Sequence, residues 1–141
     1  MRRALVIASG VLLLVAFGTW LAGELTEVVV LRSYDAEGRP HDTRLWVVDV
    51  DGSPWVRVAR PDRDWFERIQ ANPQVELERN DYWQPLRAVP IRDPEMAARV
   101  DAAFAEKYGW VDRWYGILLR RDPVPVRLDP RVAGPREAES R

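Results

Sequence analysis

Residues 57–77 read RVARPDRDWFERIQANPQVEL, and this stretch predicts a strand, a basic loop, a short helix and a second strand. Asp64 and Glu67 have the spacing of a capping box, so we expect the helix to begin at Asp64. The helix is expected to end at Asn72-Pro73, because a residue that precedes proline is disfavoured in the α region. The residues on the helix face expected to pack across a sheet are Trp65, Phe66 and Ile69.

Three arginines, Arg57, Arg60 and Arg63, crowd the segment just before this helix. A helix N-terminus has free N–H groups and the positive end of the helix dipole, so a basic loop there suits an anion such as a phosphate. The alternative is a solvated basic loop beside a packed helix.

Composition excludes several classes of protein. The chain has 141 residues, which is room for one domain, and its net charge of −1 argues against a nucleic-acid-binding protein. It has no cysteine and a single histidine, His41, so thiolate sites, histidine metal sites and a Ser-His-Asp triad are set aside. Any redox chemistry would therefore have to come from a bound cofactor.

The N-terminal segment is apolar. Residues Ala4 to Leu21 carry no charge and follow Arg2 and Arg3, which predicts an uncleaved membrane anchor at residues 1–23. Because these arginines precede the span, we expect a cytoplasmic N-terminus and a domain outside the cell membrane. A cleaved signal peptide and a buried core helix are the alternatives.

The rest of the chain alternates short apolar runs with turn residues. Asp51-Gly52 and Asn80-Asp81 indicate hairpins, and Asp93-Pro94 indicates the start of a helix. Prolines at 85 and 90 predict an edge position or bulges for their strand. The expected strands are 27–31, 42–50, 55–59, 74–78, 82–91 and 124–128. A helix is expected at 94–108, and a second short helix or a turn at 110–119.

This pattern predicts an α+β, mainly β protein: a small antiparallel barrel of about six strands with two or three helices outside, preceded by one transmembrane helix. The barrel domain is expected at residues 24–130, followed by a flexible polar tail at 131–141.

The segment from Trp65 to Val75 resembles the W-x-x-N-L-x-A-N-P-x-V element of split-barrel flavin-binding proteins, with Arg68 and Ile69 where Asn and Leu are usual. The preceding GRPHDTRLWVVDVDG and the closing PVPVRLDP are also similar to this group, which includes pyridoxamine-phosphate-oxidase-like proteins and deazaflavin-dependent nitroreductases. The resemblance covers roughly residues 28–130 and implies a six-stranded antiparallel split β-barrel that forms a homodimer.

The resemblance also implies a cofactor, either FMN or the deazaflavin coenzyme, and hydride transfer to a quinone- or nitro-type aromatic acceptor. By matched position the phosphate would be held by Arg44, Arg60, Arg63 and Asp64. Stacking faces for the ring would come from Trp65, Tyr82 and Trp83.

Two functions stay open. The first is a membrane-anchored reductase that depends on flavin or deazaflavin. The second is a non-catalytic, membrane-tethered barrel without cofactor that binds a hydrophobic ligand or an envelope protein. Residues 60–63 read RPDR where the family has small Gly and Ser residues, and this departure favours the second. Trp65 also has an alternative role as a plain core residue of its helix.

Overall fold

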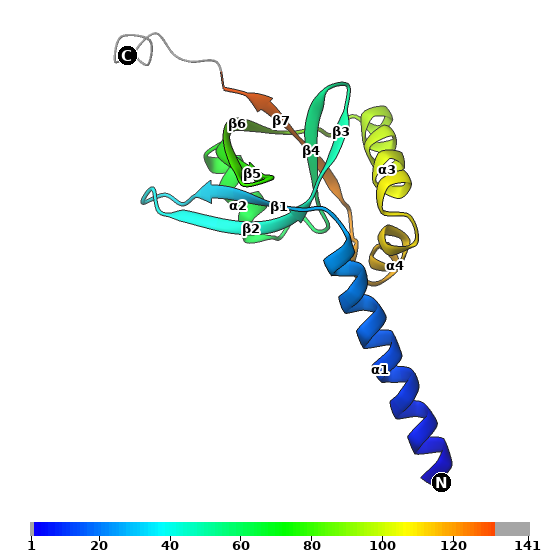
Figure 1. Cartoon of the computed structure of the whole chain (residues 1–141). Helices are drawn as coiled ribbons and strands as arrows, with labels where there is room; N and C mark the ends of the chain where they lie inside the picture. The colour runs from blue at the N-terminus through cyan, green and yellow to red at the C-terminus, as the bar shows by residue number, and fades with distance from the viewer. Residues whose placement is uncertain (1, 132–141) are drawn as a thin grey trace, which may run out of the picture.

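The computed structural model describes residues 2–131 and contains seven strands and four helices in that part of the chain (Figure 1). The elements are α1 (Arg2–Leu25), β1 (Val28–Tyr34), β2 (Pro40–Trp46), β3 (Val48–Val50), β4 (Ser53–Val58), α2 (Asp64–Ala71), β5 (Gln74–Arg79), β6 (Tyr82–Pro90), α3 (Pro94–Tyr108), α4 (Trp110–Leu119) and β7 (Val124–Pro130).

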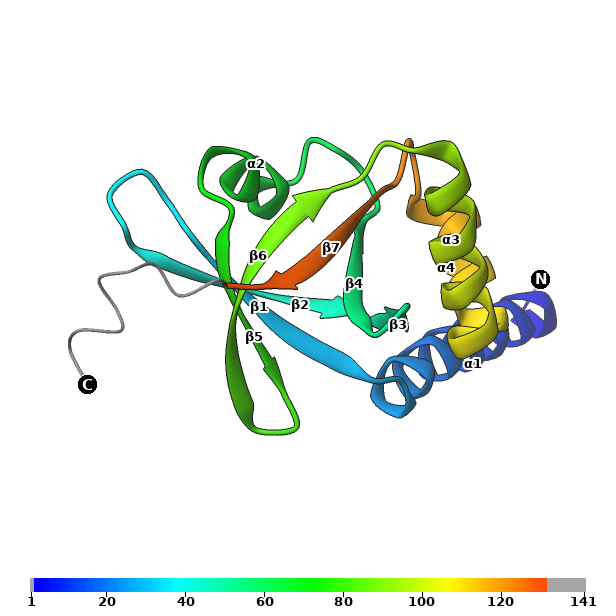
Figure 2. The same ribbon diagram turned by 90° about the horizontal axis from the view of Figure 1, so that it is seen from above.

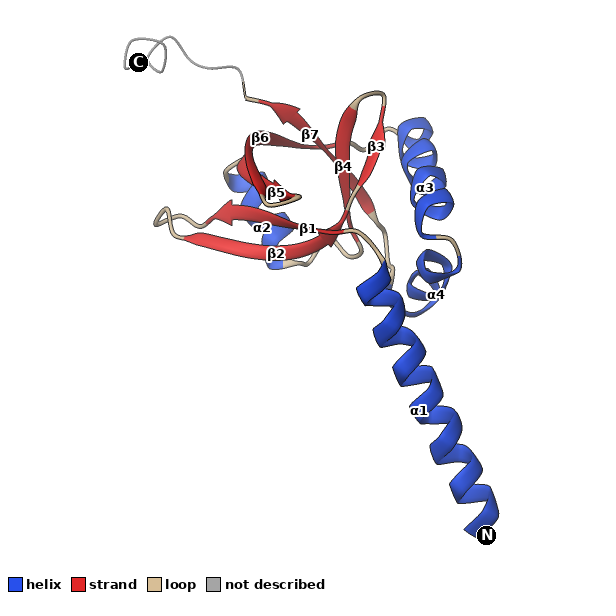
Figure 3. Cartoon of the chain, in the orientation of Figure 1, coloured by secondary structure: helices blue, strands red, loops and turns tan. Residues whose placement is uncertain are grey.

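All strands belong to one antiparallel sheet with the order β2-β1-β5-β6-β7-β4-β3. The two edge strands, β2 and β3, are separated in the chain by Val47 alone, so the sheet must curl to bring its edges together. The result is a half-barrel with helices outside it (Figure 3). The mainly β, antiparallel architecture is as expected, but the predicted number of six strands is wrong.

The extra strand arises because the run predicted as one strand, residues 42–50, is interrupted at Val47. The hydroxyl of Tyr108, from α3, accepts a hydrogen bond from the Val47 N–H at 3.1 Å and lies 2.8 Å from the Val47 carbonyl oxygen. Burial raises the pKa of Tyr108, so the phenol keeps its proton and can donate it. Lys107 also donates to that carbonyl at 2.7 Å. A long-range contact therefore replaces the sheet pairing of this residue.

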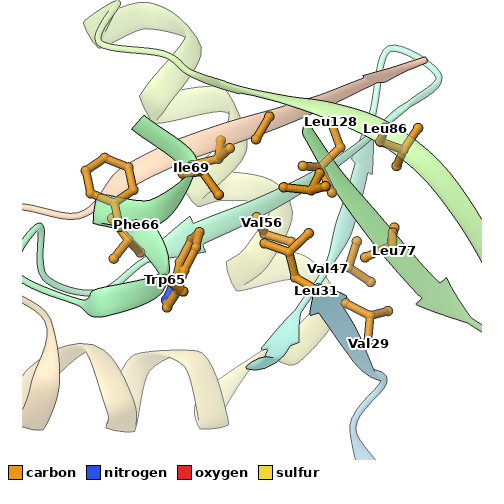
Figure 4. Packing of buried hydrophobic residues seen from close by; sticks show 14 of the residues in the cluster. Val29, Leu31, Val47, Val56, Trp65, Phe66, Ile69, Leu77, Leu86 and Leu128 are labelled. Carbon is orange, nitrogen blue, oxygen red and sulfur yellow. The ribbon is translucent and has the colours of Figure 1, made fainter. Parts of the chain in front are cut away.

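Helix α2 closes one side of the barrel core (Figure 4). Trp65, Phe66 and Ile69 are buried there among strand residues such as Leu31 and Val56, as their helical spacing predicts. The cluster's other members are Val47, between β2 and β3, and the strand residues Val29, Leu31, Val56, Val58, Val75, Leu77, Leu86, Ala88, Val124, Val126 and Leu128.

The capping box predicted for α2 is wrong. The N-cap is Arg63, and no side chain caps the helix, because Asp64 already lies inside the first turn. The predicted cap of α3 is confirmed: the Asp93 carboxylate accepts a hydrogen bond from the Met96 N–H at 2.9 Å.

Both predicted hairpins are confirmed. Asp51 and Gly52 have positive φ, as do Asn80 and Asp81, which is the conformation of tight two-residue turns whose twist matches the strands.

Strand β6 is not the predicted edge strand, because it pairs with both β5 and β7. Pro85 lies where β6 pairs with β5 only, and Pro90 lies where it pairs with β7 only. Each proline therefore has one unpaired side, where a missing N–H donor costs no ladder bond.

Helix α1 occupies the segment predicted to be a membrane anchor. Among the residues that the structure describes, no helix combines the length and the hydrophobicity needed to cross a membrane. The predicted anchor and the predicted location in the cell membrane are therefore wrong.

The single barrel domain at 24–130 stays a prediction. The predicted tail, from 132 onward, lies outside the described residues.

Candidate functional site

A pocket of about 810 Å³ lies between the open edge of the half-barrel and the helices α1, α3 and α4. Figure 2 shows these three helices on the same side of the molecule, away from α2. The residues that line the pocket are Ala16, Trp20, Val28, Arg44, Leu45, Trp46, Arg57, Ala59, Phe104, Tyr115, Leu119 and Arg120.

Stacked aromatic rings form one wall of this pocket. The ring of Trp46, at the end of β2, stacks on Tyr108 with centroids 4.6 Å apart and an interplanar angle of 12°. Tyr115 of α4 meets Trp46 edge-on at 5.2 Å, and Phe104 stacks on Tyr108 at 5.9 Å. These contacts fix Trp46 and Tyr115 as rigid, flat surfaces that suit an aromatic ligand.

Arginine side chains supply the polar part of the wall. The Arg57 side chain, on β4, is only 6% exposed, and its guanidinium lies 4.2 Å from the centre of the Phe104 ring. It donates hydrogen bonds to Asp101 of α3 at 2.7 Å and to Asp112 of α4. Arg120, at the end of α4, donates to the same Asp112 carboxylate at 2.6 Å.

The charges of this cluster nearly cancel. Arg57 and Arg120 are balanced by Asp101 and Asp112, whereas Arg44 forms no ion pair with any residue that the structure describes. Arg44 is exposed at the pocket wall. It is therefore the cation most available to an anionic ligand.

The predicted phosphate-binding residues fall partly at this pocket. Arg44 lines it, and so does Ala59, the neighbour in sequence of Arg60. The Arg60 Nε–H is buried without a hydrogen-bond partner in the described part of the chain, although Nε lies 3.3 Å from an Asp62 carboxylate oxygen. Arg63 and Asp64 are exposed where the same loop enters α2.

The predicted ring-binding residues lie elsewhere. Trp65 is 6% exposed and belongs to the barrel core, so its position is that of a core residue, the alternative role given above. Tyr82 and Trp83 are exposed at the start of β6, beside the β5–β6 turn, which Figure 2 places at the opposite end of the sheet from α2. The Arg32 guanidinium lies over the Trp83 ring, 4.2 Å from the ring centre, in a cation–π contact.

Sequence reasoning missed Trp46, Tyr115 and Asp112 as site residues. It placed Arg57 in the strand expected at 55–59 but did not assign it a role in binding a ligand. A usable signal was present: Asp112 is a lone acid in the apolar segment WVDRWYGILL. Arg57 likewise interrupts the apolar strand SPWVRV. A charged residue amid apolar neighbours indicates a buried partner of opposite charge.

Residues 22–122 match the model of a family described as "Uncharacterized protein conserved in bacteria (DUF2255)". The chain belongs to this family. No curated protein matches the sequence.

Solved structures similar to this DUF2255 chain share its split-barrel fold. HutZ, the heme storage protein from Vibrio cholerae, has 21% identity and a TM-score of 0.61 over 79% of this chain and 87% of its own. An F420-H2 dependent reductase (FDR-A) has 19% identity and a TM-score of 0.53 over 71% of this chain and 92% of its own.

A putative pyridoxamine 5'-phosphate oxidase from Listeria innocua has 15% identity and a TM-score of 0.58 over 80% of this chain and 90% of its own. A further similar structure, with 19% identity and a TM-score of 0.58, is described as a domain-swapped dimer. At these identities the likeness establishes the fold, which is that of the split-barrel group that the Trp65–Val75 segment resembles.

Proposed function

We propose that this chain binds FMN or the deazaflavin coenzyme in the pocket beside β2 and β4 and acts as a reductase. The observation that carries the proposal is the meeting of arginine side chains and stacked aromatic rings in one pocket. Its volume of about 810 Å³ falls within the usual range for small-molecule sites. The names of two fold neighbours, an F420-H2 dependent reductase and a putative pyridoxamine 5'-phosphate oxidase, support a redox ligand of this kind.

The residues present fit the phosphate of such a cofactor. Arg44 offers an exposed guanidinium, which binds phosphate oxygens through paired N–H donors. Arg60 adds a buried N–H that lacks a hydrogen-bond partner in the described residues. Arg63 and the backbone N–H of Asp64, farther along the same loop, extend the proposed phosphate site beyond the residues that line the pocket, whereas the Asp64 carboxylate would repel a phosphate.

The residues also fit a planar ring. Trp46 and Tyr115 line the pocket and are held in place by ring contacts, so we assign the ring to them instead of Trp65, Tyr82 and Trp83. When bound in its two-electron-reduced form, the cofactor would supply the hydride for a quinone- or nitro-type acceptor and would itself be oxidised. The chain then needs only to orient the ring and to exclude water with its apolar wall.

Haem bound through histidine is a poorer fit. His41 is the only histidine, and its Nε2 lies 2.9 Å from Asp35 near the β1–β2 turn, at the end of β2 opposite Trp46. No imidazole is thus available at the pocket.

The second candidate is a non-catalytic barrel that binds a hydrophobic ligand. Two observations favour it: most pocket-lining residues are apolar, and Arg57 and Arg120 are already paired with acids. We also propose a homodimer, supported by the similar structure described as a domain-swapped dimer.

Titration of the full chain with FMN and with the deazaflavin coenzyme tests the proposal. We expect saturable binding with a Kd in the micromolar range, about −8 kcal/mol. Arg44→Ala should weaken binding roughly tenfold, because one charge-assisted contact is lost. The matched control is Arg39→Ala, since Arg39 is 71% exposed on the β1–β2 turn. If the folded protein binds neither cofactor but takes up an uncharged aromatic probe, the second candidate replaces the first.

A further inference from the structure

Asp112 is a buried acid on an otherwise exposed helix. It lies in the first turn of α4 and is 4% exposed. Val111 is the only other buried residue of that helix. The exposed large apolar residues of α4 are Trp110, Trp114, Ile117, Leu118 and Leu119.

One carboxylate oxygen of Asp112 accepts hydrogen bonds from both arginines of the pocket wall, Arg57 and Arg120. Nη2 of Arg57 and Nη2 of Arg120 both donate to Oδ1, and Arg120 also donates to the Asp112 backbone carbonyl at 3.1 Å. The Arg120 side chain is 21% exposed and the Arg57 side chain 6% exposed. Both arginines line the pocket, so the position of a single oxygen fixes the orientation of two cationic side chains beside it.

Asp112 holds these groups more firmly than Asp101 does. Asp101 contacts Arg57 alone, and its side chain is 46% exposed, compared with 6% for Asp112. A buried ion pair costs desolvation energy and stabilises a fold little compared with apolar packing. What this arrangement does supply is a fixed geometry of donors beside a ligand pocket.

We infer that Asp112 is a positioning residue: it orients Arg57 and Arg120 so that the pocket prefers a ring ligand that carries a phosphate over the same ring without it. The inference rests on the proposed function for the ligand class, and it adds the residue that makes the pocket selective for charge. Arg44 binds the anion directly, whereas Asp112 acts through the two arginines.

The test compares FMN with riboflavin, which differ by the phosphate alone. The full-length wild type should bind FMN roughly tenfold more tightly than riboflavin or better. In Asp112→Asn this ratio should fall roughly threefold but stay above one, because Arg44 still binds the phosphate, while riboflavin affinity stays within about twofold. A general loosening of the fold would instead weaken both ligands equally and leave the ratio unchanged, which would overturn the inference. Asp129→Asn, which removes the partner of Arg127 outside the pocket, is the matched control and should keep the wild-type ratio.

Asp112→Glu covers the case in which the Asn variant does not fold. Glutamate keeps the negative charge that balances Arg57 and Arg120 but moves the carboxylate by one methylene. The ratio of FMN affinity to riboflavin affinity should therefore still fall. A ratio equal to that of the wild type would contradict a positioning role.

An NMR measurement without ligand separates this inference from the proposed function. Held by two carboxylates, the Arg57 guanidinium should rotate slowly and show separate Nη1 and Nη2 signals in the wild type. In Asp112→Asn these signals should merge, and signals that stay separate would overturn the inference. If the wild type binds neither FMN nor the deazaflavin coenzyme, the proposed function fails, and the Arg57 signals alone decide whether Asp112 positions the arginine.

Discussion

Val47 is the residue at which the chain passes from one edge of the sheet to the other. Its backbone N–H donates to the Tyr108 hydroxyl, and its carbonyl accepts from both Tyr108 and Lys107. The N–H therefore depends on Tyr108 alone, while the carbonyl has a second partner.

Tyr108→Phe should lower the free energy of unfolding by about 1–3 kcal/mol, because a buried N–H is left without an acceptor. Urea unfolding measures this, with Tyr82→Phe as the control, since Tyr82 is 68% exposed. Equal stability of the two variants would mean that the hydroxyl does not hold the strand break.

Glu27 joins the start of the barrel to two cations. Burial opposes its ionisation, but hydrogen bonds from Lys107 at 2.9 Å and Arg79 at 2.6 Å outweigh this and lower the pKa of Glu27. Its contribution to stability is therefore present above the unfolded-state pKa of about 4.3 and is lost as the pH falls through the lower folded pKa.

Glu27→Gln should lower the free energy of unfolding by about 1 kcal/mol at pH 7, a small effect because the site is partly solvated. The deficit relative to the wild type should shrink as the pH is lowered from 5 toward 2. Urea unfolding across this range measures it, with Glu37→Gln as a control on a 65% exposed side chain. A deficit that does not change with pH would contradict the charge-based account.

At the scale of single elements, the first residue before α2 is one that does not stabilise the start of the helix. Its N-cap is Arg63, which makes no capping hydrogen bond, although Ser, Thr, Asp and Asn are the favoured residues there. An arginine at this place is consistent with the phosphate-binding loop proposed above.

Arg63→Ser should raise the free energy of unfolding by about 1 kcal/mol, because serine can cap the helix, and should weaken FMN binding. Asp93→Ala, which removes the existing cap of α3, should lower it by a similar amount. Thermal unfolding of both variants checks the opposite signs. A destabilised serine variant would show that Arg63 serves the fold and not the ligand.

The elements that sequence reasoning predicted well are those fixed by local rules. Asp51-Gly52 and Asn80-Asp81 form the expected turns, because few residues other than Gly, Asn and Asp tolerate positive φ. The break at Val47 was not predictable in this way, since its cause is a tyrosine 61 residues later in the chain.

At the scale of the whole molecule, the antiparallel split-barrel fold and the helix α2 follow the resemblance, whereas the pocket does not. Only Arg44 of the predicted ligand residues lines it, because the pocket is assembled from α1, β2, β4, α3 and α4. Trp65 has the spacing of both a core residue and a ligand residue, and only the packing places it in the core.

The most direct test of the proposed pocket is to locate the ligand by NMR. FMN is added to the ¹⁵N-labelled full chain, and the indole and backbone N–H signals are followed. The account predicts that the Trp46 indole and the amides of Leu45 and Ala59 shift, while the indole of Trp83, which does not line the pocket, does not. Shifts confined to Tyr82 and Trp83, or no shifts in a folded protein, would contradict it.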